Sequence, residues 1–397
     1  MLGIGAKLLR AATIGGSTLS HFRSSQLPLS RFFSNNNNNV NTGFKTNPVA
    51  LQMINYALSL ARTQKSDESY AQAQLILEQC HSTQSDESAK GLVFLAMSTL
   101  FSERGNFGEA IEKLQKVQDS GLSSLAVRVA ASEALAGLYL ESYQDDSSST
   151  AADMCLQLLE SIRLEIGGGG SDILETRAKA LKGLVELVHG NVESAQSCFE
   201  GAQGSKGCFG NVALSFGEFL HCMRNFQMAR ELYQKAMQDV SESRDFTDSR
   251  SLSACNMNLE ETLLGATCAL GQLEAHAGNF DDAEEILTAA LKKAEESFGN
   301  YHPKGLYRRA IEVLKAPPLE VESAGATQSR RDILALVRGG YAETLIVQQN
   351  RKAEGENMKH WAETAWTNRR LSLAEALEPS ESSTKVAVID TRISRVL

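Results

Sequence analysis

Small and large apolar residues recur in the middle of this chain at an interval of 34 residues. A glycine, an alanine, an aromatic residue and a second alanine keep the same spacing in two successive segments: Gly183, Ala195, Phe199 and Ala202, then Gly217, Ala229, Tyr233 and Ala236. A period of this length is typical of repeat proteins in which each unit is a helix hairpin that cannot bury its apolar face alone. The pattern therefore predicts a stack of antiparallel helix pairs.

Turns of similar composition separate the expected helices. The clearest are Arg104-Gly105-Asn106, Gly190-Asn191, Arg224-Asn225 and Gly278-Asn279. Glycine and asparagine suit a turn in which the chain reverses with a positive φ between two helices. No proline lies between Val49 and His302, as expected for a body made of helices.

The interval between equivalent alanines lengthens once along the chain. Ala229 and Ala283 are 54 residues apart, which is 20 more than one repeat. We therefore expect a helix extension or a loop around residues 241–258.

Together these positions resemble the tetratricopeptide repeat family. The family's small–large–small series on the second helix is matched by Ala229, Tyr233 and Ala236, and by Ala283, Leu287 and Ala290. The ending Gly299-Asn300-Tyr301-His302-Pro303 is similar to the kinesin-light-chain type of repeat. The resemblance implies an all-α fold, a right-handed superhelical solenoid of antiparallel helix hairpins over residues 47–377. The first helix of each hairpin would line a concave surface.

The N-terminal segment differs in charge from the rest. The formal net charge is −9, yet residues 1–33 include lysine and arginine but no acidic residue. An acid-free segment of this kind is typical of an organellar transit peptide. It ends at Arg31-Phe32-Phe33-Ser34, which resembles the plant mitochondrial processing motif with cleavage between Phe33 and Ser34. We expect import into the mitochondrial matrix, with the chloroplast as the alternative, and a disordered Asn-rich linker over residues 34–46.

The remaining chain is acidic, which argues against nucleic-acid binding, because proteins that bind phosphate backbones usually carry a basic stripe. No apolar run of about 18 residues occurs, so no membrane span is expected. No motif indicates a catalytic residue, a metal ligand or a cofactor, and we expect the protein not to be an enzyme. His221-Cys222 is the nearest approach to a metal-binding pair, and we interpret it as groove lining.

The inner helices decide what a solenoid binds. Aligned on the repeat, the residues expected to line a partner groove are Arg177, Leu184, Leu187, Asn211, Leu214, Glu218, His221, Gln272 and His276. The apolar positions favour an amphipathic helix or an extended peptide in the groove, or the protein's own tail folded back. The Lys/Asn/Arg clamp with which some members of the family bind the carboxylates of chaperone tails is not seen. The competing interpretation is that these residues only pack helix against helix.

We therefore expect a non-enzymatic adaptor, scaffold or assembly factor that binds another protein in the mitochondrion. The alternative is an accessory factor in organellar RNA processing or translation. Residues 378–397, which contain the short apolar run from Val386 to Ile389, are expected to form a flexible C-terminal tail.

Processing of the N-terminus is testable on the protein isolated from cells. If residues 1–33 are a transit peptide, the mature chain begins at Ser34, because the basic segment is removed after import. Mass determination of the mature N-terminus measures this directly, and Phe33→Ala is the control expected to lose that cleavage. A chain that keeps its first residues in cells would contradict the targeting prediction.

Overall fold

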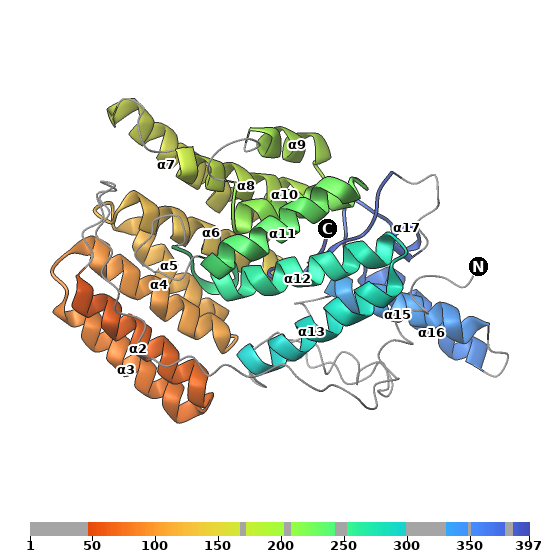
Figure 1. Cartoon of the computed structure of the whole chain (residues 1–397), viewed down its shortest axis with the longest axis horizontal. Helices are drawn as coiled ribbons and strands as arrows, with labels where there is room; N and C mark the ends of the chain where they lie inside the picture. The colour runs from red at the N-terminus through yellow and green to blue at the C-terminus, as the bar shows by residue number, and fades with distance from the viewer. Residues whose placement is uncertain are drawn as a thin grey trace.

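The computed structural model describes residues 47–166, 172–201, 208–242, 252–298, 331–347, 351–377 and 384–397, which form mainly helices (Figure 1). Four features predicted from the sequence lie outside these residues. They are the transit peptide, the cleavage site at Phe33 and Ser34, the linker of residues 34–46 and the helix-ending motif of residues 299–303.

The described helices pack in consecutive hairpins. These are α2 (Pro48–Gln64) with α3 (Asp67–Thr83), α4 (Glu87–Glu103) with α5 (Phe107–Asp119), α6 (Leu125–Glu141) with α7 (Asp145–Ile166), α8 (Asp172–Val188) with α9 (Val192–Glu200), α10 (Asn211–Cys222) with α11 (Phe226–Glu242), α12 (Leu259–His276) with α13 (Phe280–Phe298), and α15 (Arg331–Ile346) with α16 (Lys352–Ala365). The even-numbered helices from α2 to α12 also pack on one another and form the inner layer. The predicted all-α hairpin solenoid is confirmed. None of the described helices is both long and apolar enough to cross a bilayer.

The turns between helices reverse as the sequence predicts. Gly105, Gly190 and Gly278 have φ values of 76°, 82° and 87°, and Arg224 occupies the equivalent position with φ 60°. In each turn the N–H of the asparagine that follows donates to a carbonyl in the last turn of the preceding helix, at 2.8 to 2.9 Å. These bonds satisfy carbonyl groups that the end of a helix leaves unpaired.

The repeating glycines lie where the two helices of a hairpin approach most closely. A Cβ atom on Gly217 would lie 2.7 Å from the ring of Tyr233, and one on Gly183 would lie 2.8 Å from the ring of Phe199. Both rings are fully buried. The 34-residue interval in the sequence therefore marks the point where the two helices of each of these hairpins touch. Only glycine fits at that point.

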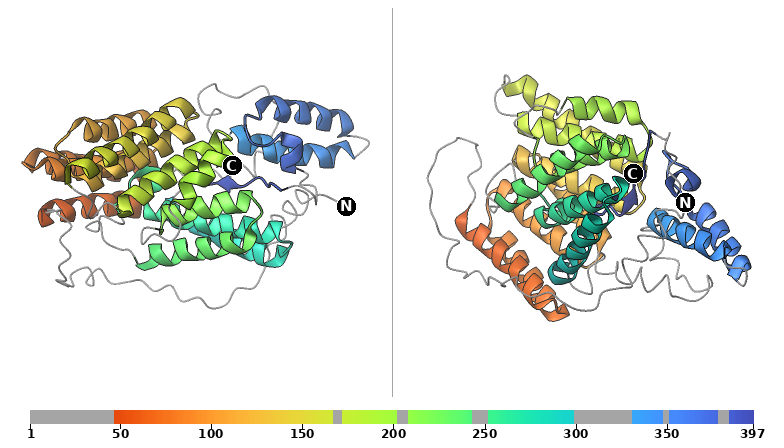
Figure 2. Two further views of the ribbon diagram at one scale, coloured as in Figure 1. Left: turned by 90° about the horizontal axis from the view of Figure 1, so that it is seen from above. Right: turned by 45° about the vertical axis from the view of Figure 1, so that its right-hand side comes forward.

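Two non-helical parts of the chain pack against the inner layer. Residues 252–258, at the end of the expected insertion, include the short helix η2 (Cys255–Met257) and contact α4, α6 and α12. Residues 384–397 contain two antiparallel strands, β1 (Ile389–Asp390) and β2 (Arg395–Val396). In both views of Figure 2 they lie between α10–α12 and the α15–α16 hairpin.

The expectation of a flexible tail does not hold for residues 384–397. Val388, Ile393 and Leu397 have no exposed surface. Their segment packs between α12 of the stacked pairs α2–α13, here called the array, and α15 of the last hairpin, which α17 (Leu373–Leu377) also contacts. The short apolar run that begins at Val386 is thus part of the core.

The glycine–ring contact predicts the effect of a single methyl group. Gly217→Ala should destabilise the protein by roughly 1–3 kcal/mol, because the buried Tyr233 ring has to move. Gly108→Ala on α5 is the matched control, since its Cβ would meet nothing within 4 Å. It should be neutral or stabilising by up to about 1 kcal/mol. Thermal unfolding followed by circular dichroism compares the two, and equal midpoints would show that the repeat register is misassigned.

Candidate functional site

Two parts of the chain cover the inner face of the array, here called the inner segment (residues 252–258) and the C-terminal segment (residues 384–397). The structure places the predicted groove residues on this inner layer, and none of them is exposed. Asn211, Glu218 and Gln272 form hydrogen bonds with the C-terminal segment. The leucines at 184, 187 and 214 are also buried. The groove is therefore occupied by the chain itself.

Gln272 on α12 binds the backbone of the C-terminal segment as a neighbouring strand would. The Ile389 N–H donates to Gln272 Oε1 at 2.8 Å, and Gln272 Nε2 donates to the Ile389 carbonyl at 2.9 Å. Nearby, the Val386 N–H donates to the Cys222 carbonyl at 3.1 Å, and Arg370 Nη2 donates to the Val386 carbonyl at 2.5 Å. These hydrogen bonds go to the backbone of the segment, so they bind an extended polypeptide whatever its side chains are.

Arg392 is the buried centre of the C-terminal segment. Its side chain has no exposed surface. The guanidinium donates to Asn211 Oδ1 at 2.9 Å, to Ser215 Oγ at 3.1 Å and to Glu218 Oε2 at 2.5 Å. These acceptors are spaced four and three residues apart on α10, so they share one face of that helix. Asp390, two residues before the arginine, accepts a further bond at 2.8 Å.

The arginine site contains more negative than positive groups. Burial raises the pKa of Glu218 well above its usual range, Arg392 opposes the shift, and the neighbouring Asp390 carboxylate adds to it. Glu218 Oε1 accepts no hydrogen bond although it is buried. One guanidinium thus faces two carboxyl groups, whose mutual repulsion in a buried site adds to the rise in the pKa of Glu218.

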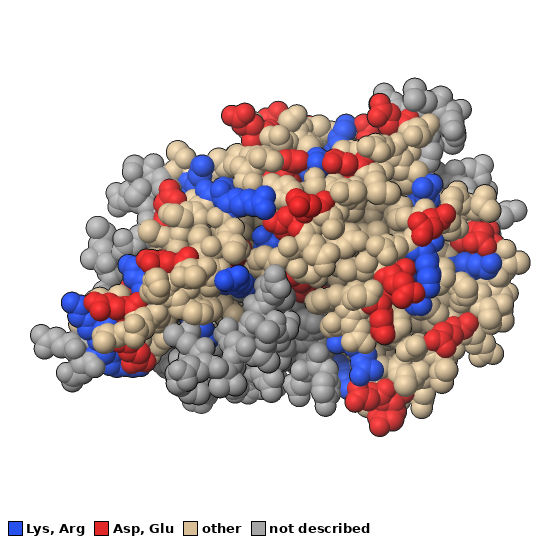
Figure 3. All heavy atoms as spheres, turned by 180° about the vertical axis from the view of Figure 1, so that it is seen from behind, with Lys and Arg blue, Asp and Glu red and all other residues tan. Residues whose placement is uncertain are grey.

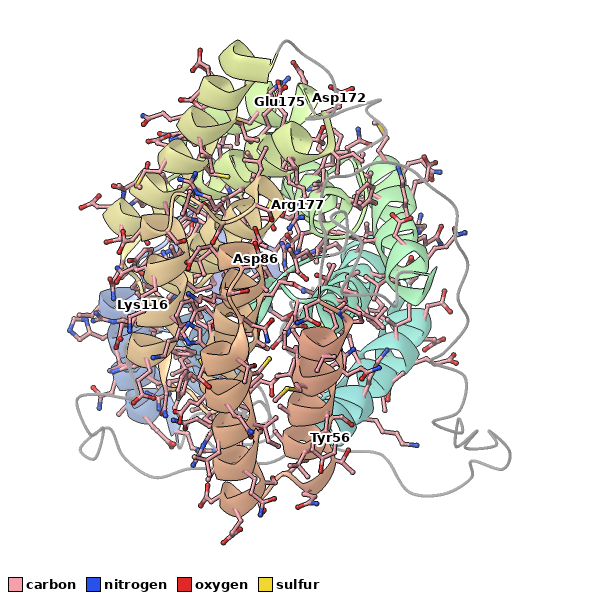
Figure 4. The ribbon with its side chains drawn as sticks, turned by 90° about the vertical axis from the view of Figure 1, so that its left-hand side faces the viewer. Tyr56, Asp86, Lys116, Asp172, Glu175 and Arg177 are labelled. Carbon is pink, nitrogen blue, oxygen red and sulfur yellow. The ribbon has the colours of Figure 1, made fainter. Side chains whose placement is uncertain are left out.

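A second buried arginine holds the inner segment. Arg177 lies inside the array in Figure 4, whereas Asp172 and Glu175, earlier on α8, lie at its edge. Arg177 forms an ion pair with Glu133 on α6 and donates to the Leu252 carbonyl at 2.6 Å. This groove residue therefore binds the inner segment rather than the C-terminal segment.

The two segments meet at two polar residues of the inner layer. Glu141 accepts from Asn256 Nδ2 of the inner segment at 3.2 Å and from Ser394 Oγ of the C-terminal segment at 3.3 Å. Asn211 donates to the Met257 carbonyl at 2.6 Å, and its oxygen accepts from the guanidinium described above. The two segments therefore adjoin each other on the inner face, where the inner segment contacts α4, α6 and α12.

A buried chain of hydrogen bonds links α10, α11 and α12. His221 Nδ1 lies 3.1 Å from the Tyr233 hydroxyl, and His221 Nε2 lies 2.9 Å from His276 Nδ1. Burial, reinforced by His276, lowers the pKa of His221 well below its usual range. Burial, reinforced by Arg224, lowers the pKa of His276 to about 4. Both rings are therefore neutral near pH 7, and each supplies one donor and one acceptor.

The described residues offer little reactive chemistry. No group of three His, Cys, Asp or Glu side chains among them is placed to hold a metal ion. Burial raises the pKa of the Cys222 thiol to about 11 and that of Cys255 to about 12. Neither thiol therefore forms a thiolate at neutral pH, which is the form that reacts.

The sequence did not identify Arg392 or its pairing with Glu218. The apolar run before it was visible, but an Asp and an Arg after such a run are typical of a solvated tail. The alternation of apolar residues with Asp390 and Arg392 was the available signal. Likewise, His221 and His276 were predicted separately as groove residues, and the structure brings them together.

On the face shown in Figure 3, acidic and basic side chains are interspersed. That face therefore offers no continuous basic track for a phosphate backbone. A scan against protein-family models and a search of curated proteins found no match to this chain.

Acid should weaken the histidine chain. An unfolded histidine titrates near pH 6.5, whereas His276 in the folded protein titrates at about 4. Between these values the unfolded state binds more protons, so stability falls as the pH falls. His276→Gln should reduce the stability lost between about pH 7 and 4.5 by roughly 1–3 kcal/mol, measured by urea unfolding.

The stability of His276→Gln has to be compared with that of the wild type at each pH. This is because Glu218 changes stability with pH in the direction opposite to His276. Its pKa is raised on folding, so it contributes stability that is lost as the pH rises. His360→Gln on α16 is the matched control, since that histidine is exposed, and it should keep wild-type acid sensitivity. If His276→Gln lost as much stability in acid as the wild type, the buried neutral His276 ring would not be the cause of the acid sensitivity.

Proposed function

We propose that this protein is a non-enzymatic scaffold of the tetratricopeptide type that binds an extended polypeptide segment of a protein partner along α8, α10 and α12. One observation carries the proposal: the inner face already binds such a segment, residues 384–397 of the same chain. Gln272 binds its backbone, and α10 binds its arginine. A surface that binds one extended segment has the donors, acceptors and apolar positions to bind another of similar chemistry.

The C-terminal segment, called the resident segment below because it occupies the groove, belongs to the same chain as the groove. This covalent connection favours it over a partner that is free in solution. A segment joined to its own site has an effective concentration in the millimolar range for a short flexible connection. A partner at cellular concentration must therefore bind more tightly than the resident segment does in its untethered form. The resident segment would thus exclude weak competitors and admit a partner with better contacts.

The acid-free N-terminal segment supports a place of action in the mitochondrion, with the chloroplast as the alternative. A scaffold role there agrees with the rigid hairpin packing of the array, since close helix contacts such as Gly217 against Tyr233 fix the curvature of the groove.

Exchange is testable with the full-length chain and a labelled peptide of residues 384–397. Arg392→Ala should loosen the resident segment, because the substitution removes its bonds to Asn211, Ser215 and Glu218. The peptide should bind this variant with a Kd of about 1–100 μM, measured by fluorescence anisotropy. Binding to the wild-type chain should be weaker, because its own segment competes.

The matched control adds Gln272→Ala to the Arg392→Ala chain, which removes both backbone bonds to Ile389 and should weaken the peptide further. Circular dichroism establishes that each variant keeps its helices. If no folded variant binds the peptide, the C-terminal segment is a fixed part of the core and the groove is not a binding site.

A further inference from the structure

The resident segment fits the groove in shape but not in charge. Arg392, Glu218 and Asp390 all have fully buried side chains. Arg392 Nη2 lies 2.5 Å from Glu218 Oε2 and 2.8 Å from Asp390 Oδ2, so a single cation serves both carboxyl groups. An ion pair in a buried site is tolerated when it is balanced, and an unbalanced charge is strongly unfavourable.

The two carboxyl groups have different origins. Glu218 belongs to the groove, whereas Asp390 is part of the segment that fills it. In the hydrogen bonds described above, the groove contributes one carboxyl group, one amide oxygen from Asn211 and one hydroxyl from Ser215, all of which accept from the guanidinium. That set matches one arginine. The segment brings one carboxyl group together with its one cation, so it leaves the carboxyl group of the groove without a cation of its own.

The acceptors also discriminate between arginine and lysine. Asn211 binds Nη1, while Ser215 and Glu218 bind Nη2, so the site uses two nitrogens of a planar fork. A lysine ammonium is a single point of charge on a flexible stem and cannot occupy both positions. Around the arginine, Val388 and Ile393 of the segment are fully buried, so the groove also requires apolar residues on both sides.

From this geometry we propose the chemistry of the partner, an inference that rests on the proposed scaffold function. The groove is an arginine-reading site, and the segment it accepts from a partner is extended and apolar, with an arginine at the position of Arg392. The residue two positions before that arginine is neutral. The chain's own segment, which has Asp390 there, is the weaker ligand and is displaced.

Asp390 also stabilises the turn that follows it, and a partner segment with a neutral residue at this position needs another acceptor for that turn. Its Oδ1 accepts from the Arg392 N–H at 2.8 Å and from Arg392 Nε at 3.2 Å, which fixes the turn between β1 and β2. An asparagine keeps this oxygen and the turn while removing the charge, but its amide nitrogen replaces Oδ2, so the bond from Arg392 Nη2 at 2.8 Å is lost in both of the chains compared below. Its amide group can donate to a carboxylate oxygen, and Glu218 Oε1 is buried without a hydrogen bond. Asparagine is therefore the appropriate test residue.

The experiment compares peptides of residues 384–397 as competitors for the groove of the full-length chain carrying Arg392→Ala. The peptide with Asp390→Asn should bind about tenfold more tightly than the unchanged peptide, since the arginine then pairs with Glu218 alone. The peptide with Arg392→Lys should bind about tenfold or more weakly than the unchanged peptide. Fluorescence anisotropy gives all three affinities.

A second chain, carrying Glu218→Gln together with Arg392→Ala, closes a double-mutant cycle. There the unchanged peptide brings a balanced Asp–Arg pair, whereas the Asp390→Asn peptide brings an unpaired arginine. The order of affinity should therefore invert. A merely structural effect of asparagine on the turn would give the same preference in both chains.

The outcomes separate this inference from the function on which it rests. If the unchanged and Asp390→Asn peptides bind equally well, or the order does not invert with Glu218→Gln, the charge argument is overturned while the scaffold function stands. If lysine replaces arginine without loss, the site does not read arginine. If no peptide binds either chain, both the inference and the scaffold function are overturned.

Discussion

Hydrogen-bonding side chains on the inner face of the array need partners, and the rest of the architecture depends on how they are met. A buried polar group without a partner costs roughly 1–3 kcal/mol, and a buried charge costs more. Glu141, Glu218 and Gln272 all project from the inner layer, and each forms hydrogen bonds with residues of the inner segment or the C-terminal segment. Two segments of the chain supply the missing partners, and for that reason the groove is filled.

The C-terminal segment also joins parts of the molecule that would otherwise be separate. Asn368, after α16, donates to the Val396 carbonyl at 2.6 Å, and Arg395 packs 3.8 Å over the ring of Tyr143 at the end of α6. Arg395 further pairs with Asp145 on α7 at 3.0 Å. The α15–α16 hairpin is thus held against the array by a segment that contacts both, and also directly, since the Asp332 N–H donates to the Tyr143 hydroxyl at 3.1 Å. Loss of the segment from the groove would loosen the last hairpin as well.

Much of the fold was predictable from the sequence, because the repeat records a local contact. Glycine and its facing ring lie within one hairpin, so the register appears as a fixed interval. The arginine site was not predictable in the same way, since Arg392 and Glu218 are 174 residues apart in the chain. No local pattern specifies such a pairing. His221 and His276 illustrate an intermediate case: each was placed on the inner layer, but the lengthened interval between their repeats concealed that they meet.

The two buried arginines stabilise the inner face in different ways. Arg177 and its partner Glu133 both belong to the array, so their charges remain balanced whether or not the groove is occupied. Arg392 leaves with its segment. Without the segment Glu218 is open to water, so the burial that raises its pKa in the filled groove is relieved. An empty groove would therefore be tolerated for a time.

The position of the C-terminal segment in the chain gives that tolerance a use. Residues 384–397 follow every helix that they cover in the chain, and Ser394 bonds to Glu141 across 253 residues of sequence. Local hairpins form quickly, whereas contacts across such distances form late. Each newly made molecule thus passes through a stage in which the array is assembled and its groove is open. Under the proposed function, a partner present at that stage would bind without displacing the C-terminal segment, so the order of folding would determine which segment the groove holds.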